Sequence, residues 1–300
     1  MKKRLQDAIK ERPLLGDGVV ARHRRVVRAG LGAWAVLIYA FLFVPIALLM
    51  LFSFNANRYG TFPITGWTLH WYEEALSNYQ IQDAVQTSLQ VALEVTVIST
   101  VVGTAAAFPL VRSRLPFRGG IRASLTLPIL IPGLLIGVAL LSYFTNLFNL
   151  QLSIQTAVIG QAVYATPFVI LVVASRLEGF DRLLERAASD LGADTWKRLR
   201  YIVLPLIGPA VVAGALFAFT LSLDEFIITL FLIGGHNTLP IYIYTQVKFG
   251  ITPEVNAVAT MLIAASLSVS LLAFATPALG RLARRRLRTA WSVTGSDHTA

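Results

Sequence analysis

Long stretches without a charged residue limit what this chain can fold into more than any other feature of its sequence. Residues 31–54 are 24 consecutive uncharged positions, and a helix of that length, rising about 1.5 Å per residue, crosses a hydrocarbon core about 30 Å thick. Residues 123–175 are 53 uncharged positions, enough for two spans, which a cluster of Asn, Gln and Ser at 146–153 divides. The pattern predicts an all-α membrane protein with six transmembrane helices, at about 31–54, 86–111, 123–145, 154–176, 201–223 and 255–280.

The basic residues give these six spans an orientation. If both termini lie in the cytoplasm, 24 of the 26 Lys and Arg residues fall on the cytoplasmic side and only Arg58 and Lys248 fall outside. This asymmetry is the positive-inside signal, so the net charge of +10 on a chain that is 55% hydrophobic indicates topology and not nucleic-acid binding. We expect a basic cytoplasmic segment at 1–30, a membrane domain at 31–280 and a basic cytoplasmic tail at 281–300, in the lipid of a bacterial cytoplasmic (inner) membrane.

One uncharged segment, residues 226–247, is not counted as a span. It is interrupted by Gly234, Gly235 and Pro240, and a crossing here would place the arginines of the tail outside, against the charge rule. We therefore expect this segment to be external or re-entrant, buried against protein or lining a water-filled cavity.

The cytoplasmic loop at 178–200 has the pattern of a helix, a sharp turn and a second helix. Asp181 is placed to cap the first helix, in which apolar residues recur at helical spacing on one side. Gly192 can take the left-handed conformation that ends this helix, and Asp194 can cap the next one. An ordered cytoplasmic loop with a small-residue face suits docking into a groove of another protein.

This loop resembles the EAA loop of ABC-importer permeases, in which Glu-Ala-Ala is followed after three residues by Gly and later by Ile-x-Leu-Pro. The matching positions are Ala187, Ala188, Gly192, Ile202, Leu204, Pro205 and Pro209. One position departs from the pattern, because Arg186 occupies the Glu position and Glu185 precedes it. The residues that the resemblance implies in coupling to an ATPase are Glu185, Arg186, Ala187, Ala188, Asp190, Gly192, Ala193, Ile202, Leu204 and Pro205.

The resemblance implies a type I ABC-importer permease architecture, with this loop as a coupling helix seated in a separate nucleotide-binding subunit. It also implies a second permease subunit as a heterodimer partner, two ATP-binding subunits, and a periplasmic or lipid-anchored solute-binding protein. The sequence has no GxxxxGK(S/T) phosphate loop, so we expect ATP and Mg²⁺ to be bound by the partner and no cofactor by this chain. With no cysteine and four widely separated histidines, the sequence predicts neither a metal site nor an enzyme.

The expected substrate is a polyamine. The run from Phe219 to Thr260 resembles the second permease of spermidine/putrescine importers, of the PotC and PotI type. Two adjacent acids lie at the external end of the fifth span and a third lies within the second, and intramembrane acids often mark a substrate pathway. Carboxylates and aromatic rings suit a flexible polycation. The predicted pathway residues are Asp224, Glu225, Phe226, Glu94, Tyr143 and Tyr164.

Other interpretations stay open on the sequence alone. Asp224 and Glu225 would equally serve as backbone caps where the helix breaks before Gly234, and Glu94 would serve as a partner in a hydrogen bond to a neighbouring helix. Segments like Leu-Asp-Glu-Phe also occur in permeases for other solutes, so an importer of an amino compound or of ferric iron is the second interpretation. A secondary transporter driven by an ion gradient would also show bent spans and buried acids, but it would not need residues 185–205.

Overall fold

The computed structural model of the chain describes residues 17–58, 62–112, 117–179, 181, 183–249, 253–265 and 267–268. Among these residues the regular structure is helical, apart from one isolated bridge between Asn55 and Trp67. They fall into two compact units, one with the described residues from 74 to 249 and the other with those up to 73 and from 253 on. The first of these units holds the coupling loop and all the predicted pathway residues.

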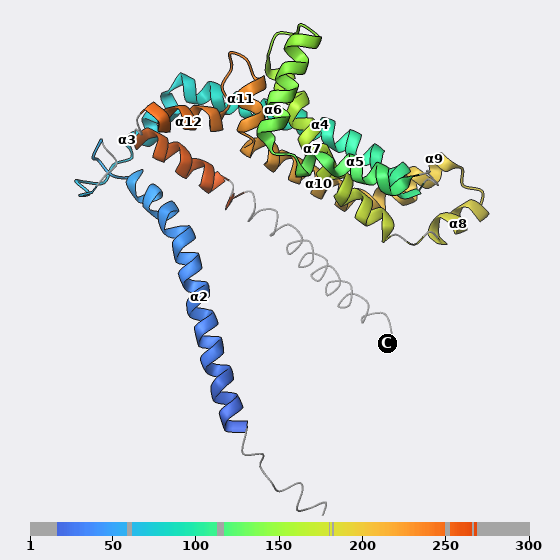
Figure 1. Ribbon diagram of the computed structural model, residues 1–300, viewed down its shortest axis with the longest axis horizontal. Coiled ribbons are helices and arrows are strands. Elements are labelled where there is room, and N and C mark those ends of the chain that lie inside the picture. Colours follow the sequence, from blue (N-terminus) through green and yellow to red (C-terminus); the bar gives the residue numbers. More distant parts are fainter. Residues whose placement is uncertain are drawn as a thin grey trace, which may run out of the picture. The chain divides into compact units, whose positions relative to one another are not determined.

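The helices follow one another along the chain as shown in Figure 1. Their bounds are α2 Asp17–Phe52, α3 His70–Ser77, α4 Tyr79–Arg112, α5 Arg118–Leu130, α6 Gly133–Ser142, η1 Tyr143–Leu147, α7 Ile154–Glu178, α8 Leu183–Asp190, α9 Thr195–Arg198, η2 Leu199–Val203, α10 Leu204–Asp224, α11 Ile227–Leu232 and α12 Leu239–Phe249. A further helix covers Pro253–Ala265. The predicted all-α class is confirmed.

Helix α2 belongs to the unit formed by the two ends of the described chain. Its apolar part, Val27–Phe52, has 26 residues and a mean hydropathy of 2.7, and no residue in its most apolar window is buried. Trp34 and Phe41, for example, are 66% and 78% exposed. A helix that is apolar on all sides and keeps these side chains exposed suits a lipid environment, as the prediction of a first span at 31–54 requires.

Helices α4, α7 and α10 pack against one another to form the core of the other unit. Val169 of α7 lies between glycines of the other two helices. A Cβ placed on Gly103 of α4 would lie 2.8 Å from Val169 Cβ, and a Cβ on Gly214 of α10 would lie 3.2 Å from Val169 Cγ1. Small residues allow membrane helices to approach this closely. The hydrophobic cluster around these helices includes Val91, Val95, Val158, Val173, Val203 and Ile207.

The third predicted span is a broken helix. Gly119–Leu130 and Gly133–Leu147 meet at an angle of 98°, so the segment predicted as a span at about 123–145 is not one straight helix. Pro132 explains the break, because it has no N–H to donate and its ring keeps the preceding residue out of the α region. Ile131 is accordingly extended, with φ of −85° and ψ of 126°.

The segment at 226–247 contains two short helices, α11 and α12, instead of one long helix. Ile228, Thr229 and Leu232 are fully buried, and α11 packs against α6 and α7. The chain turns after α11 at Gly234, which has a φ of +70°, and a Cβ there would overlap the carbonyl of Leu152. The segment is therefore not one continuous helix, and its α11 part is buried against protein, as one of the predicted alternatives requires.

Four described helices are long and apolar enough to cross a membrane, and the broken pair raises the number to five. The four are Val27–Phe52, Tyr79–Arg112, Ile154–Glu178 and Thr195–Asp224. The sixth predicted span, at 255–280, includes most of the helix Pro253–Ala265, and most of the remainder of this span lies outside the described residues. The predicted basic tail at 281–300 also lies outside them. The count of six spans, the cytoplasmic termini and the domain limits therefore remain predictions.

Candidate functional site

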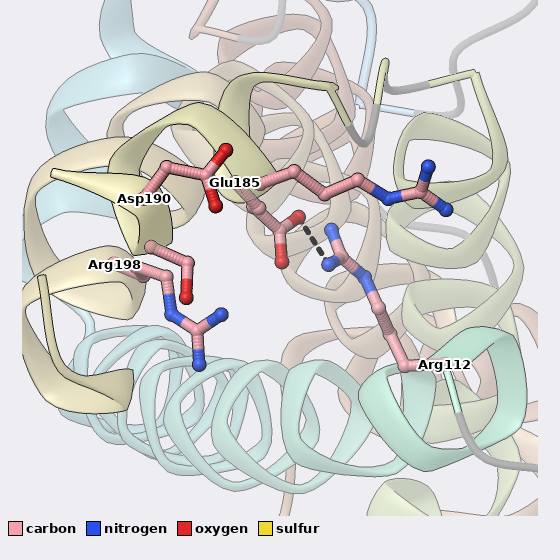
Figure 2. Close-up of a pocket in the computed structure, with 6 residues that line it drawn as sticks. Arg112, Glu185, Asp190 and Arg198 are labelled. Carbon is pink, nitrogen blue, oxygen red and sulfur yellow. Dashed lines mark hydrogen bonds and ion pairs between the residues drawn. The ribbon is translucent and has the colours of Figure 1, made fainter. Parts of the chain in front are cut away.

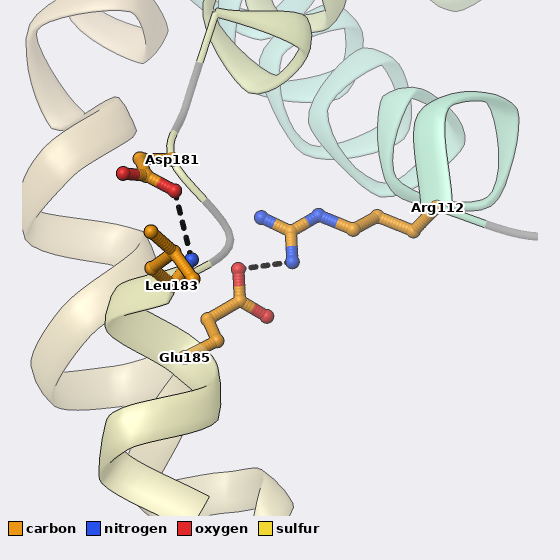
Figure 3. A network of polar contacts seen from close by, with 4 residues as sticks. All are labelled: Arg112, Asp181, Leu183 and Glu185. Atoms are coloured by element: carbon orange, nitrogen blue, oxygen red, sulfur yellow. Dashed lines mark hydrogen bonds and ion pairs between the residues drawn. The ribbon is translucent and has the colours of Figure 1, made fainter.

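The coupling loop begins with a capped helix. Helix α8 starts where Asp181 Oδ1 accepts a hydrogen bond of 2.9 Å from the backbone N–H of Leu183. This bond satisfies one of the donors that every helix leaves free at its N-terminus. The predicted capping role of Asp181 is confirmed, and Figure 3 shows the contact.

Helix α8 ends in a Schellman motif centred on Gly192. Gly192 has a φ of +84°, its N–H donates to the Ser189 carbonyl, and the Ala193 N–H donates to the Ala188 carbonyl, both at 2.9 Å. Glycine is favoured here because a Cβ is unfavourable in the left-handed region. The predicted turn at Gly192 is confirmed.

The chain then enters the membrane helix without a further turn. Asp194 Oδ1 accepts a hydrogen bond of 2.7 Å from the Lys197 N–H, which caps α9 as predicted. Helix α9 continues through the π-helical turn η2 into α10, and together they form the 30-residue helix Thr195–Asp224. Pro205, which lacks an N–H, lies directly after η2, where the wider π turn leaves the regular hydrogen-bond ladder. The motif residues Ile202, Leu204 and Pro205 thus lie at the entrance to α10.

An ion pair ties α8 to the end of a transmembrane helix. Glu185 Oε1 accepts a hydrogen bond from Nη1 of Arg112, the last residue of α4 (Figures 2 and 3). The two side chains are only 20% and 19% exposed, so salt screens this pair less than a fully exposed one. The coupling helix is therefore linked to α4 directly, in addition to its covalent path into α10.

Two further arginines form hydrogen bonds between helices at this end of the unit. Arg122 Nη1 donates to Glu178 Oε1 at 2.9 Å, and Arg176 Nε donates to the Leu206 carbonyl at 3.2 Å. In the sequence, Arg112 and Arg122 indicated only topology, and nothing in residue spacing joined them to acids more than 50 positions away. Their partner roles were therefore missed.

The apolar side chains of the coupling loop are not covered by this chain. Every residue of α8 is described and none is buried. Leu183 is 63% exposed, Leu184 49%, Leu191 89% and Trp196 64%. Large exposed apolar side chains gathered in one short loop indicate an interaction surface.

Two cavities flank α8. The first, of about 440 Å³, is polar, and Figure 2 shows four of its charged residues, contributed by α4, α8 and α9. The second, of about 740 Å³, is mainly apolar and lies between α4 and the start of α10. The first is lined by Arg112, Glu185, Arg186, Ser189, Asp190 and Arg198, and the second shares three of these residues, Arg112, Glu185 and Arg198.

The two adjacent acids at the end of α10 have different surroundings. Glu225 is half-buried, and its Oε1 accepts a hydrogen bond of 2.8 Å from the Ile228 N–H in the first turn of α11. The capping interpretation therefore holds for Glu225. Asp224 is exposed and has no hydrogen-bond or ion-pair partner among the residues that the structure describes, so its charge is free to meet a ligand.

The other predicted pathway residues are only partly brought together. Tyr164 and Phe226 pack against the same hydrophobic cluster, formed by α6, α7 and α11, and the Phe226 ring lies 4.7 Å from the Tyr244 ring. Tyr143, in η1, is 47% exposed. Glu94 accepts a hydrogen bond of 2.9 Å from Gln90 in its own helix, not from a neighbouring helix, and within the described part of the chain no hydrogen bond or ion pair links it to the others.

A buried polar network next to the helix break was not predicted. Gln161 of α7 is 1% exposed, its Nε2 donates to Thr229 Oγ1 at 2.5 Å, and its Oε1 accepts a hydrogen bond from Ser222 Oγ. Thr229 Oγ1 in turn donates to the Glu225 carbonyl at 2.9 Å. The network fixes α7, α10 and α11 to one another, and a single Gln in an apolar stretch gave no sign of it.

Comparisons with known proteins agree on one kind of molecule. Residues 99–289 match the family described as binding-protein-dependent transport system inner membrane component. The chain is 37% identical over 237 residues to the spermidine/putrescine transport system permease protein PotC of Escherichia coli (strain K12), which covers 79% of this chain and 89% of PotC. It is 35% identical over 243 residues to the putrescine transport system permease protein PotI of the same strain, covering 77% and 86%.

A likeness to a solved structure concerns the fold alone. A chain in the crystal structure of a bacterial ABC transporter involved in the import of the acidic polysaccharide alginate matches with a TM-score of 0.65 at 14% identity, covering 84% of this chain and 96% of that chain. The helical arrangement is thus that of an ABC-importer permease.

Proposed function

This chain belongs to the family of binding-protein-dependent transport system inner membrane components, and on that premise we propose that it is the permease subunit of an ATP-driven importer of polyamines. The observation that carries the choice of cargo is the identity of 35–37% with PotC and PotI over more than three quarters of the chain. The proposed cargo is spermidine or putrescine.

The side chains support a cationic cargo. The fold alone does not determine the charge of the cargo, because the alginate transporter with a matching fold is involved in the import of an acidic polysaccharide. Here Asp224, the last residue of α10, presents an exposed carboxylate, and two residues further on Phe226 lies against Tyr244. A polycation would pair with the carboxylate and lie against the rings, whereas an anion would be repelled. The proposed pathway residues remain Asp224, Glu225, Phe226, Glu94, Tyr143 and Tyr164.

The coupling loop supplies the link to ATP. In this proposal α8 is seated in a cleft of an ATP-binding subunit, which binds ATP and Mg²⁺, and closure of two such subunits moves α8. Because α8 is paired through Glu185 with Arg112 of α4 and followed directly by α9 and α10, its displacement reaches two membrane helices. A second permease subunit completes the pathway, and a solute-binding protein delivers the cargo to it, so that the site opens alternately to the two sides.

Uptake by the complete importer tests this function. We reconstitute this chain in proteoliposomes with its second permease, the ATP-binding subunits and the binding protein. We expect these vesicles to transport labelled spermidine or putrescine only when ATP is present on the side of the membrane that carries the ATP-binding subunits. Replacing Asp224 by Asn together with Glu225 by Gln should lower this uptake without changing the affinity of the binding protein. Accumulation of an amino acid or ferric iron in place of polyamine would refute the cargo, and uptake driven by an ion gradient without ATP would refute the importer class.

A further inference from the structure

The polar cavity beside α8 has an excess of positive charge among the described residues that line it. Of its six lining residues three are arginines and two are acids. One acid, Glu185, is already paired with Arg112. Arg186 and Arg198 therefore face a single remaining carboxylate, that of Asp190.

Arg186 and Arg198 both have N–H donors that bind no acceptor among the described residues. Arg198 Nη2 donates to Thr195 Oγ1 at 3.1 Å, but its Nε is buried and has no hydrogen-bond partner among the described residues. A buried donor without an acceptor is unfavourable, so an acceptor is expected to complete this site. Arg186 is exposed, and within the described part of the chain it has no hydrogen-bond or ion-pair partner.

We propose that this cavity receives an acidic side chain of the ATP-binding subunit, which pairs with Arg186 and Arg198. The inference rests on the proposed docking of α8 in that subunit. The planar guanidinium group matches a carboxylate with two parallel hydrogen bonds, and the exposed Leu183 and Leu191 of the same loop indicate a protein surface and not a small ion. The occupant is thus a carboxylate set in an apolar cleft.

The reversed sign at this position makes the contact selective for its partner. The EAA pattern has a glutamate where this chain has Arg186, and the neighbouring Glu185 is engaged inside the chain by Arg112. The charge offered to the ATP-binding subunit is therefore positive. A cleft that presents a cation at the facing position would repel this coupling helix, while a cleft that presents Asp or Glu would hold it.

The test measures how tightly the detergent-solubilised permease pair binds its ATP-binding subunit. We expect Arg186→Glu to weaken this binding at least about tenfold, Arg186→Lys to weaken it much less, and the difference to shrink as salt rises from about 0.05 M to about 0.5 M. The matched control is Arg200→Glu, which reverses an exposed cation of the same loop that lines neither cavity. Among single Asp→Lys and Glu→Lys variants of the ATP-binding subunit, one should restore binding to the Arg186→Glu chain.

The outcomes separate this inference from the function on which it rests. If Arg186→Glu binds no more weakly than Arg200→Glu while Gly192→Val abolishes binding, the loop docks as proposed but the acidic contact is refuted. If Gly192→Val leaves binding intact, docking of the loop itself is refuted and the contact with it. If the effect of Arg186→Glu appears only in nanodiscs with anionic lipid and is lost in zwitterionic lipid, an anionic lipid headgroup occupies the cavity and the acidic contact is refuted.

Discussion

Arg112 and Glu185 are 73 positions apart in the sequence and join the end of α4 to the coupling helix by an ion pair. In addition to its covalent connections, back to α7 and onward through α9 into α10, the coupling helix therefore has this direct contact with α4. Since α4 and α10 both pack on α7, a displacement of α8 acts on two sides of the same three-helix core.

The first prediction concerns that ion pair. We expect Arg112→Gln and Glu185→Gln each to lower ATP-driven transport roughly tenfold, because either change removes the charge pair between two shielded side chains. ATP hydrolysis should fall much less, which would identify uncoupling. The matched control is Arg122→Gln, which breaks the pair with Glu178 where the side chains are 47% and 41% exposed and is expected to be nearly neutral. Equal losses in all three variants would contradict a special role of the shielded pair.

The second prediction concerns the turn at Gly192. No atom lies within 4 Å of a Cβ placed there, so any effect of substitution comes from the φ of +84° and not from crowding. We expect Gly192→Val to disfavour the turn by about 1–2 kcal/mol or more and to reduce transport strongly, and Gly192→Asn, a residue that tolerates the left-handed region, to retain most activity. Transport rates normalised to the amount of inserted chain measure this. Equal activity of the two variants would show that the turn is not required.

Local patterns predicted the coupling loop, while contacts between distant residues escaped prediction. The caps at Asp181 and Asp194 and the turn at Gly192 depend on backbone groups within a few residues, so the sequence contains them. The pair of Arg112 with Glu185 depends on how three helices pack, and packing of this kind leaves no spacing that a single sequence displays.

The break in the third span is also a local feature. The run without charges at 123–145 predicted the span but not the position of its break, which at Ile131 and Pro132 follows from the chemistry of proline. The network of Gln161 is the opposite case. Its partners Ser222 and Thr229 lie more than 60 positions away, and no pattern around Gln161 indicates them.

The third prediction separates the two adjacent acids. Glu225 Oε1 accepts the Ile228 N–H, and a Gln amide oxygen can accept the same bond, so Glu225→Gln should leave the chain folded while Glu225→Ala should lower its yield in the membrane. Asp224 has no partner within the described part of the chain, so Asp224→Asn should leave the yield unchanged and raise the polyamine concentration needed for half-maximal uptake. Uptake kinetics and membrane yield of the three variants decide this, and wild-type kinetics in Asp224→Asn would remove Asp224 from the pathway.

The fourth prediction tests the close packing at the centre of the core. A Cβ on Gly103 would lie 2.8 Å from Val169 Cβ, closer than carbon atoms of packed side chains approach, whereas on Gly214 it would lie 3.2 Å from Val169 Cγ1. We expect Gly103→Ala to destabilise the permease by about 1–3 kcal/mol, as overpacking does, and Gly214→Ala to destabilise it less. Thermal unfolding in detergent measures both. Because Val169→Ala removes Cγ1, which would lie 2.9 Å from the new Cβ, the double variant Gly103→Ala with Val169→Ala should be more stable than the sum of the two single changes indicates. Strict additivity would show that α4 and α7 do not meet at these two residues.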